Sequence, residues 1–253
     1  MIATFTALLF AHALADFVLQ TGWVHANKRR FGVLLLHGAL VLGATQAALG
    51  QIAAPGILLL ALAHLVIDSI KTYGRFTGPV AFLTDQAAHL VTLAALAFWG
   101  AGLWAQGFYA EHLPMPAQAL LLHAMALATG VILTCRAGDF AIRELIEAQA
   151  KAPRQPGEQP PTQDGLPRGG RTIGYLERLL IFLLVMAGQF SAIGFLVTAK
   201  SILRFGTVSN DREATEYVII GTLASFGWAI ALAMATDSLL GGLPPLEIFT
   251  PMP

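Results

Sequence analysis

Histidine and aspartate residues recur four positions apart in the most apolar part of this sequence. The three pairs are His12 with Asp16, His64 with Asp68, and, in reversed order, Asp85 with His89. Residues four apart share one face of an α-helix, so each pair presents an imidazole nitrogen beside a carboxylate oxygen. Such atoms bind zinc, manganese or iron. The pattern therefore predicts a divalent metal site with these six residues as ligands, and with Asp16 and Asp85 as its catalytic carboxylates.

Three further polar side chains support this prediction. Gln20 continues the face of the first pair, His37 lies in the second apolar run, and Gln86 adjoins the third pair. A rise of about 1.5 Å per residue places Asp16, His37 and Asp85 each roughly 9 Å from the same membrane surface. Ionisable groups within a span cost about 2.5–3.5 kcal/mol and usually face a protein interior. We therefore expect the groups to converge in one layer of the bundle.

A single pair of this kind is typical of a hydrogen bond that holds two membrane helices together. Three pairs and a fourth histidine at one depth favour a functional site instead. The first hypothesis is a metal-dependent hydrolase acting on a lipid-linked or membrane-proximal substrate from the cytoplasmic leaflet. The alternatives are a proton- or cation-coupled transporter and a non-catalytic membrane subunit.

The elements that position these groups are predicted to be transmembrane helices. The chain is 56% hydrophobic and 12% charged, with a mean hydropathy of +0.66, whereas soluble domains are about 25% charged. The sequence predicts an all-α, polytopic transmembrane helix bundle of about seven spans. The predicted spans cover 2–22, 32–50, 54–71, 79–105, 116–137, 173–198 and 214–238. The net charge is zero, so the expected partner is the lipid bilayer and not nucleic acid.

The domain organisation follows from the composition along the chain. Residues 1–150 form a predicted five-span half that carries the histidine and aspartate cluster. Residues 151–171 contain five prolines and four glycines, which predicts a disordered cytoplasmic linker. Residues 172–253 form a predicted two-span C-terminal half. The first basic residue is Lys28, so the apolar N-terminal run is expected to be a retained span and not a cleaved secretory signal.

Loop charges predict the orientation in the membrane. Seven spans place twelve of the fifteen basic residues on one side, and leave only Lys200, Arg204 and Arg212 on the other. Because basic loops favour the cytoplasm, the N-terminus is expected outside and the C-terminus inside. Three basic residues in one outer loop are more than this rule favours. Either that loop lies against the outer surface, or the sixth segment does not cross fully.

Several motifs are similar to a bacterial inner-membrane family catalogued as domain of unknown function 3307. They are His12-Ala-Leu-Ala-Asp16-Phe-Val-Leu-Gln20 with Asn27-Lys28, His64-Leu-Val-Ile-Asp68 and Asp85-Gln86-Ala-Ala-His89, followed in the second half by stretches within 170–178, 199–205 and 216–222. The resemblance implies an inner-membrane location but supplies no reaction. It also draws attention to Lys200, Arg204 and Glu216 as a second polar site, in which the two basic residues would bind an anion.

Overall fold

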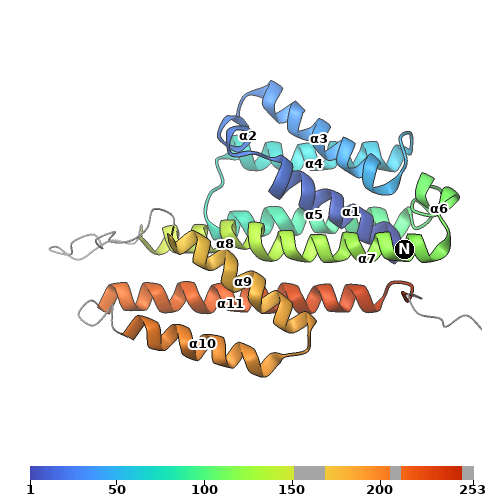
Figure 1. Ribbon diagram of the computed structural model, residues 1–253. Helices are drawn as coiled ribbons and strands as arrows, with labels where there is room; N and C mark the ends of the chain where they lie inside the picture. Colours follow the sequence, from blue (N-terminus) through green and yellow to red (C-terminus); the bar gives the residue numbers. More distant parts are fainter. Residues whose placement is uncertain (151–168, 206–211, 247–253) are drawn as a thin grey trace, which may run out of the picture. The chain divides into compact units, whose positions relative to one another are not determined.

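The computed structural model describes residues 1–150, 169–205 and 212–246, and every regular element in these ranges is helical (Figure 1). The elements are α1 (Ile2–Leu14), η1 (Ala15–Leu19), α2 (Gly22–Asn27), α3 (Phe31–Leu49), α4 (Pro55–Gly74), α5 (Pro79–Trp99), α6 (Phe108–His112), α7 (Met115–Ile132), η2 (Leu133–Ala137), α8 (Gly138–Ala150), α9 (Gly169–Met186), α10 (Phe190–Phe205) and α11 (Arg212–Gly241). The predicted linker lies outside the described residues, except for its last three positions.

The predicted all-α transmembrane bundle is confirmed. Within the described ranges, six helical segments are long and apolar enough to cross a membrane, namely Ile2–Leu19, Phe31–Leu49, Pro55–Gly74, Pro79–Trp99, Met115–Gln149 and Glu216–Gly241. Helix α4 exposes apolar side chains and buries polar ones, as expected in lipid. Its Leu59 and Leu62 are 67% and 58% exposed, whereas His64 and Asp68 are each 3% exposed. The apolar face of this helix is therefore available to lipid, and its polar face is turned inward.

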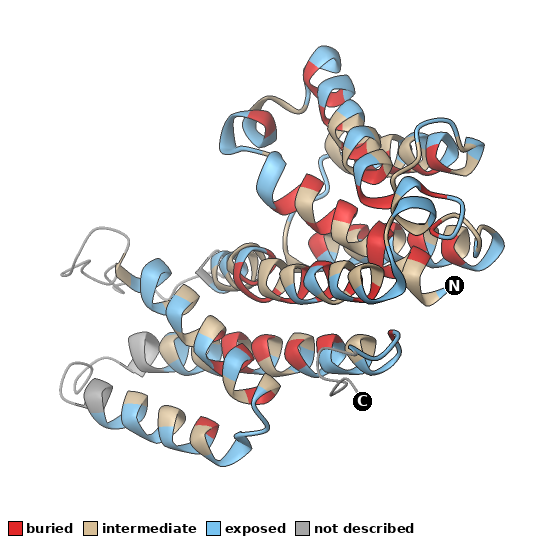
Figure 2. Cartoon of the chain, turned by 45° about the vertical axis from the view of Figure 1, so that its right-hand side comes forward, coloured by how far each residue is buried: buried red, intermediate tan, exposed pale blue. Residues whose placement is uncertain are grey.

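The described chain forms two compact units. Unit 1 contains Met1–Leu133 together with the residues from Thr236 onward, and unit 2 contains Thr134–Ala235. In unit 1, helix α1 packs against α3, α5 and α7. Its buried Ala7 and Ala11 allow close approach of the neighbouring helices, as small residues do in membrane bundles. Figure 2 shows that buried residues lie mainly where the helices of each unit face one another.

Local sequence signals set the ends of the unit 1 helices that carry the cluster. Pro55 and Pro79 occupy the first turns of α4 and α5, where the absent N–H leaves no intrahelical hydrogen bond unmade. Gly50 ends α3 in the left-handed conformation, with φ of 66°. These ends fix how far each helix extends and so where its polar residues lie along the bundle.

The predicted sixth span, 173–198, is divided between two helices of unit 2. Helix α9 ends at Met186, Gly188 adopts a φ of 67°, and α10 begins at Phe190. The side chains of Glu177 on α9 and Lys200 on α10 meet at 2.5 Å. The two helices therefore form an antiparallel hairpin (Figure 1), and the end of α10 returns toward the start of α9.

Candidate metal centre

The first helix positions His12 and Asp16 with the help of a change in its hydrogen-bonding pattern. His12 lies near the end of α1, and Asp16 lies in the π-helical segment η1. Single π-turns within α-helices are frequent at functional sites. Gln20, predicted to continue the same face, lies just past η1 with a ψ of 86°, outside the helical conformation. It therefore contributes to the cluster only indirectly.

The six predicted ligands lie together in unit 1, and His37 lies among them. His37 comes from α3, His64 and Asp68 from α4, and Asp85 and His89 from α5. All seven side chains are buried, with exposed fractions between 0 and 8%. Four helices therefore bring their ionisable groups to one place in the bundle, as the common depth predicted.

The shortest separations define a triangle between three helices. The Nε2 atom of His37 lies 3.2 Å from Nε2 of His64 and 3.4 Å from Oδ1 of Asp16. The third side, from Nε2 of His64 to the same Asp16 oxygen, is 3.3 Å. Oδ2 of Asp68 caps the triangle, at 3.2 Å from the His37 nitrogen and 3.3 Å from the His64 nitrogen.

Hydrogen bonding alone does not account for this convergence. Each Nε2 carries at most one proton, yet each of the two nitrogens faces two carboxylate oxygens and the other nitrogen. Ligands at about 2.0–2.1 Å in a tetrahedral site lie about 3.3–3.4 Å from one another. The five measured separations agree with this spacing to about 0.2 Å. The geometry is thus that of a centre able to hold a metal ion, formed by His37, His64, Asp16 and Asp68.

His12, Asp85 and His89 surround this centre at longer range. His89 stacks on His64 with ring centroids 4.0 Å apart, and its Nε2 lies 3.7 Å from Oδ1 of Asp85. Neither ring nitrogen of His89 has a hydrogen-bond partner among the described residues. His12, His64 and His89 also line a cavity of about 10 Å³, which is close to the smallest space that holds a water molecule.

Gln86 connects the outer residues to one another. Its amide nitrogen donates to Oδ2 of Asp85 at 3.2 Å, and its Oε1 lies 3.3 Å from Nε2 of His12. This residue thereby fixes the orientation of one carboxylate and one imidazole ring of the cluster, which come from different helices. Such supporting contacts hold ligands in place and tune their basicity.

Two lysines complete the site, and neither was among the predicted site residues. Lys28 contacts Oδ2 of Asp68 at 2.8 Å and donates to Gln20 at 2.8 Å. Lys71 contacts Oδ2 of Asp85 at 2.8 Å and keeps 31% of its side chain exposed. Lys71 lies one helical turn after Asp68, and this spacing could have indicated that it shares the polar face of α4. Nothing in the local sequence indicated that the loop before α3 would fold back to bring Lys28 to Asp68.

The second predicted polar site lies partly outside the described residues. Lys200 lies in unit 2, paired with Glu177 and with its ammonium group 5.1 Å from the centre of the Phe226 ring. The side chain of Arg204 lies outside the described residues. Glu216 is exposed and does not line the cavity that Lys200 borders.

Comparison with known proteins supports the predicted resemblance over the first part of the chain. Residues 4–113 match the family described as "Protein of unknown function (DUF3307)". This region contains the complete histidine and aspartate cluster, whereas the motifs quoted from the second half lie beyond it. No curated protein and no solved structure matches the chain. The chain thus resembles this family through the residues that build the candidate metal centre.

Proposed function

We propose that this protein is a metal-dependent membrane hydrolase that acts on a lipid-linked or membrane-proximal substrate from the cytoplasmic leaflet. The observation that carries the proposal is the triangle of His37, His64 and Asp16, whose three sides measure 3.2, 3.3 and 3.4 Å. Two histidines and one carboxylate are a ligand set of hydrolytic zinc sites, in which water takes the fourth position. Manganese and iron also accept this combination of ligands.

Lys28 would keep Asp68 from acting as a fourth protein ligand of the metal ion. Its ammonium group lies 2.8 Å from the Asp68 oxygen that caps the triangle, so it competes with the ion for that oxygen. A site with four protein ligands is closed and structural, whereas a catalytic site retains a position for water. Asp68 held by Lys28 would then accept a hydrogen bond from that water and orient it.

The remaining residues have roles that suit hydrolysis. His89, paired with Asp85 at 3.7 Å, would receive the proton from the attacking water as a general base. Lys71 is the charged side chain of the cluster with the largest exposed fraction, and it lies near the end of α4. Its ammonium group would bind the negative charge of a substrate headgroup presented at the surface of the leaflet.

Elemental analysis of detergent-purified protein tests the metal centre. The wild type should retain about one divalent ion per chain after desalting, because three protein ligands converge on one point. The His64→Ala variant should lose the ion. His123→Ala should keep the ion, because the His123 ring donates a hydrogen bond to the Ala119 carbonyl of its own helix and lies outside the cluster. A wild-type protein that retains no ion after loading with zinc, manganese or iron would contradict the proposal.

Transport is a second candidate, favoured by one specific observation. A chain of titratable groups in close contact runs from His37 through Asp68 to Lys28, with separations of 3.2 and 2.8 Å. Such a chain is suited to relaying protons. Tight metal retention with chelator-sensitive release of product from a lipid ester or phosphate supports the hydrolase. Weak, exchangeable metal binding with proton-driven uptake in proteoliposomes supports the transporter.

We further propose an inner-membrane location with the N-terminus outside. The hairpin of α9 and α10 brings the end of α10 back to the end of unit 2 where α9 begins. Lys200 would therefore share the side of Arg171, and all fifteen basic residues would be cytoplasmic. The predicted cytoplasmic C-terminus required 173–198 to cross once. With the hairpin, the C-terminus would instead lie outside.

Reporter fusions distinguish these two arrangements. Fusions after Arg30, Gln149 and Ser201 should all read as cytoplasmic, and a fusion after Glu111 should read as external. A fusion after Leu246 should be external with the hairpin and cytoplasmic with a single crossing. An external reading after Ser201 would show that the hairpin does not set the topology.

A further inference from the structure

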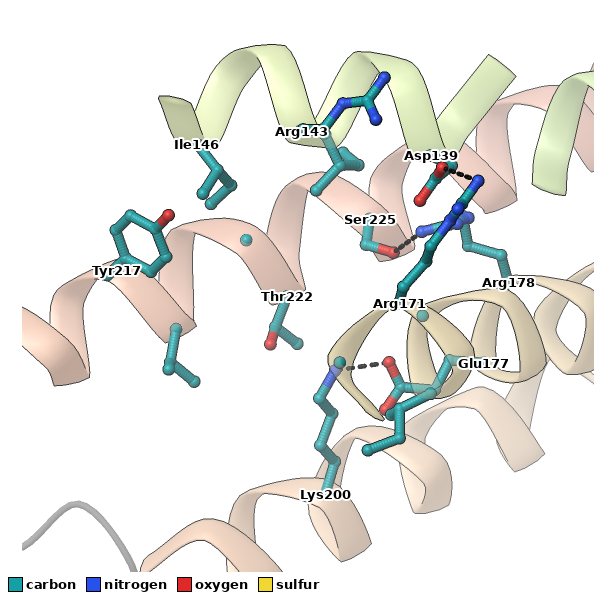
Figure 3. Close-up of a pocket in the computed structure, with 16 residues that line it drawn as sticks. Asp139, Arg143, Ile146, Arg171, Glu177, Arg178, Lys200, Tyr217, Thr222 and Ser225 are labelled. Carbon is teal, nitrogen blue, oxygen red and sulfur yellow. Dashed lines mark hydrogen bonds and ion pairs between the residues drawn. The ribbon is translucent and has the colours of Figure 1, made fainter. Parts of the chain in front are cut away.

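A second cavity lies entirely within unit 2, between α8, α9, α10 and α11 (Figure 3). Its volume is about 400 Å³, which is in the range of small-molecule sites. The charged side chains of its lining are Asp139, Arg143, Arg171, Glu177, Arg178 and Lys200. Four of these are basic and two are acidic, so the lining carries an excess of positive charge.

Two of the basic side chains are held by the two carboxylates. Arg171 contacts Asp139 at 2.9 Å, and Lys200 contacts Glu177 at 2.5 Å. Figure 3 shows both pairs among the side chains that line the cavity. These pairs place the two cations at fixed positions, and the two carboxylates act on the guanidinium of Arg178 only through longer-range attraction.

Arg178 is 3% exposed and lines this cavity. Its guanidinium donates to Oγ of Ser225 and to the carbonyl oxygen of Cys135, both at 3.2 Å. Both acceptors are neutral, and within the described part of the chain the Nε atom has no hydrogen-bond partner. A buried charge whose neighbouring carboxylates are already paired with other cations remains costly. An anion in the cavity would therefore supply the charge and the Nε acceptor that Arg178 lacks among the described residues.

The backbone is shaped around this guanidinium. A Cβ atom on Gly174 would lie 3.1 Å from a terminal nitrogen of Arg178, and one on Gly138 would lie 3.0 Å from its Cδ. The ring of Tyr175 faces the guanidinium at 5.3 Å. The two glycines and the aromatic ring form a slot that holds the planar group in one orientation.

We propose that this cavity binds a phosphate group. The rigid fork of an arginine matches phosphate oxygens in a bidentate manner, and Arg171 and Lys200 add further donors at the rim. The hydroxyl of Thr222 also borders the cavity. The volume exceeds that of a phosphate ion, so the ligand carries a further group beside the phosphate. It is either the headgroup of an anionic phospholipid or a soluble phosphate compound.

Binding measurements on the full-length protein in detergent test the proposal. The probes are dioleoyl phosphatidic acid, measured by native mass spectrometry against dioleoyl glycerol, and inorganic pyrophosphate, measured by thermal shift against chloride at equal ionic strength. Arg178→Gln should weaken the binding of the effective probe about tenfold or more, because it removes charge-assisted hydrogen bonds. Arg136→Gln is the matched control, since Arg136 is exposed and does not line the cavity.

The outcomes separate the two sources of phosphate. Selective binding of phosphatidic acid, lost in Arg178→Gln, identifies a lipid headgroup, and stabilisation by pyrophosphate identifies a soluble ligand. If Arg178→Gln does not fold, Arg171→Gln carries the test, since its side chain is 46% exposed. Binding of neither probe, or equal binding by the arginine variants and the Arg136 control, would overturn the proposal. Either result is independent of the metal content of unit 1.

Discussion

Replacement of Lys28 by methionine tests the metal centre directly, because the ammonium group of Lys28 and a bound metal ion would compete for the same Asp68 oxygen. Lys28 and Asp68 form a pair at 2.8 Å, with 11% and 4% of their side chains exposed. Methionine preserves the apolar stem and removes the charge. In the metal-free protein, Asp68 then remains buried without a counter-ion. In the metal-loaded protein, the ion takes over that role.

The expected magnitudes follow from this exchange of partners. Breaking a buried ion pair by removing one partner costs about 3–5 kcal/mol, so the metal-free variant should be destabilised by about this amount. If the ion restores about half of the loss, the loaded variant is about 2 kcal/mol less destabilised than the metal-free one. By thermodynamic linkage the variant must then bind the ion more tightly by the same free energy, which corresponds to about 30-fold in Kd.

The assay measures unfolding in detergent by tryptophan fluorescence, with chelator and with saturating metal. Competition with a chelating dye gives the metal affinity of the same samples. Arg30→Met is the control, since Arg30 belongs to the same loop and is exposed. Hydrolysis, if it depends on an open fourth position, should fall in Lys28→Met although the metal is bound more tightly. Equal destabilisation with and without metal, together with unchanged affinity, would refute a metal ion beside Asp68.

Three further expectations concern other parts of the chain. Gln86→Leu should weaken metal binding or activity about 10- to 100-fold, because Gln86 orients Asp85 and His12; unchanged values in the dye competition would deny it that role. Lys71→Met should lower the rate of hydrolysis while leaving the metal content intact, and elemental analysis alongside a rate measurement would show whether both change together. Deletion of most of 152–168 should leave expression and the unfolding midpoint nearly unchanged, and loss of folded protein would show that this segment makes necessary contacts.

Much of the candidate site was predictable because the relevant spacing is local. The pairs of His12 with Asp16 and His64 with Asp68 lie within single helices, so the helical period alone places each pair on one face. The membrane adds the second constraint, since polar groups within a span turn away from lipid. His37 had no partner on its own helix, and it was therefore predicted only as a supporting residue. The structure places its Nε2 at one corner of the central triangle.

The sequence alone determined that the chain forms an all-α membrane bundle and that its polar groups point inward. Both properties depend on local periodicity and on the bilayer as solvent. Tertiary structure decided which atoms of different helices meet. Asp68 meets Lys28 because the chain folds back before α3, and Glu177 meets Lys200 because the turn at Gly188 reverses the chain. Contacts of this kind join residues 23 or more positions apart, and they depend on helix packing and turn geometry, which no spacing within a single helix encodes.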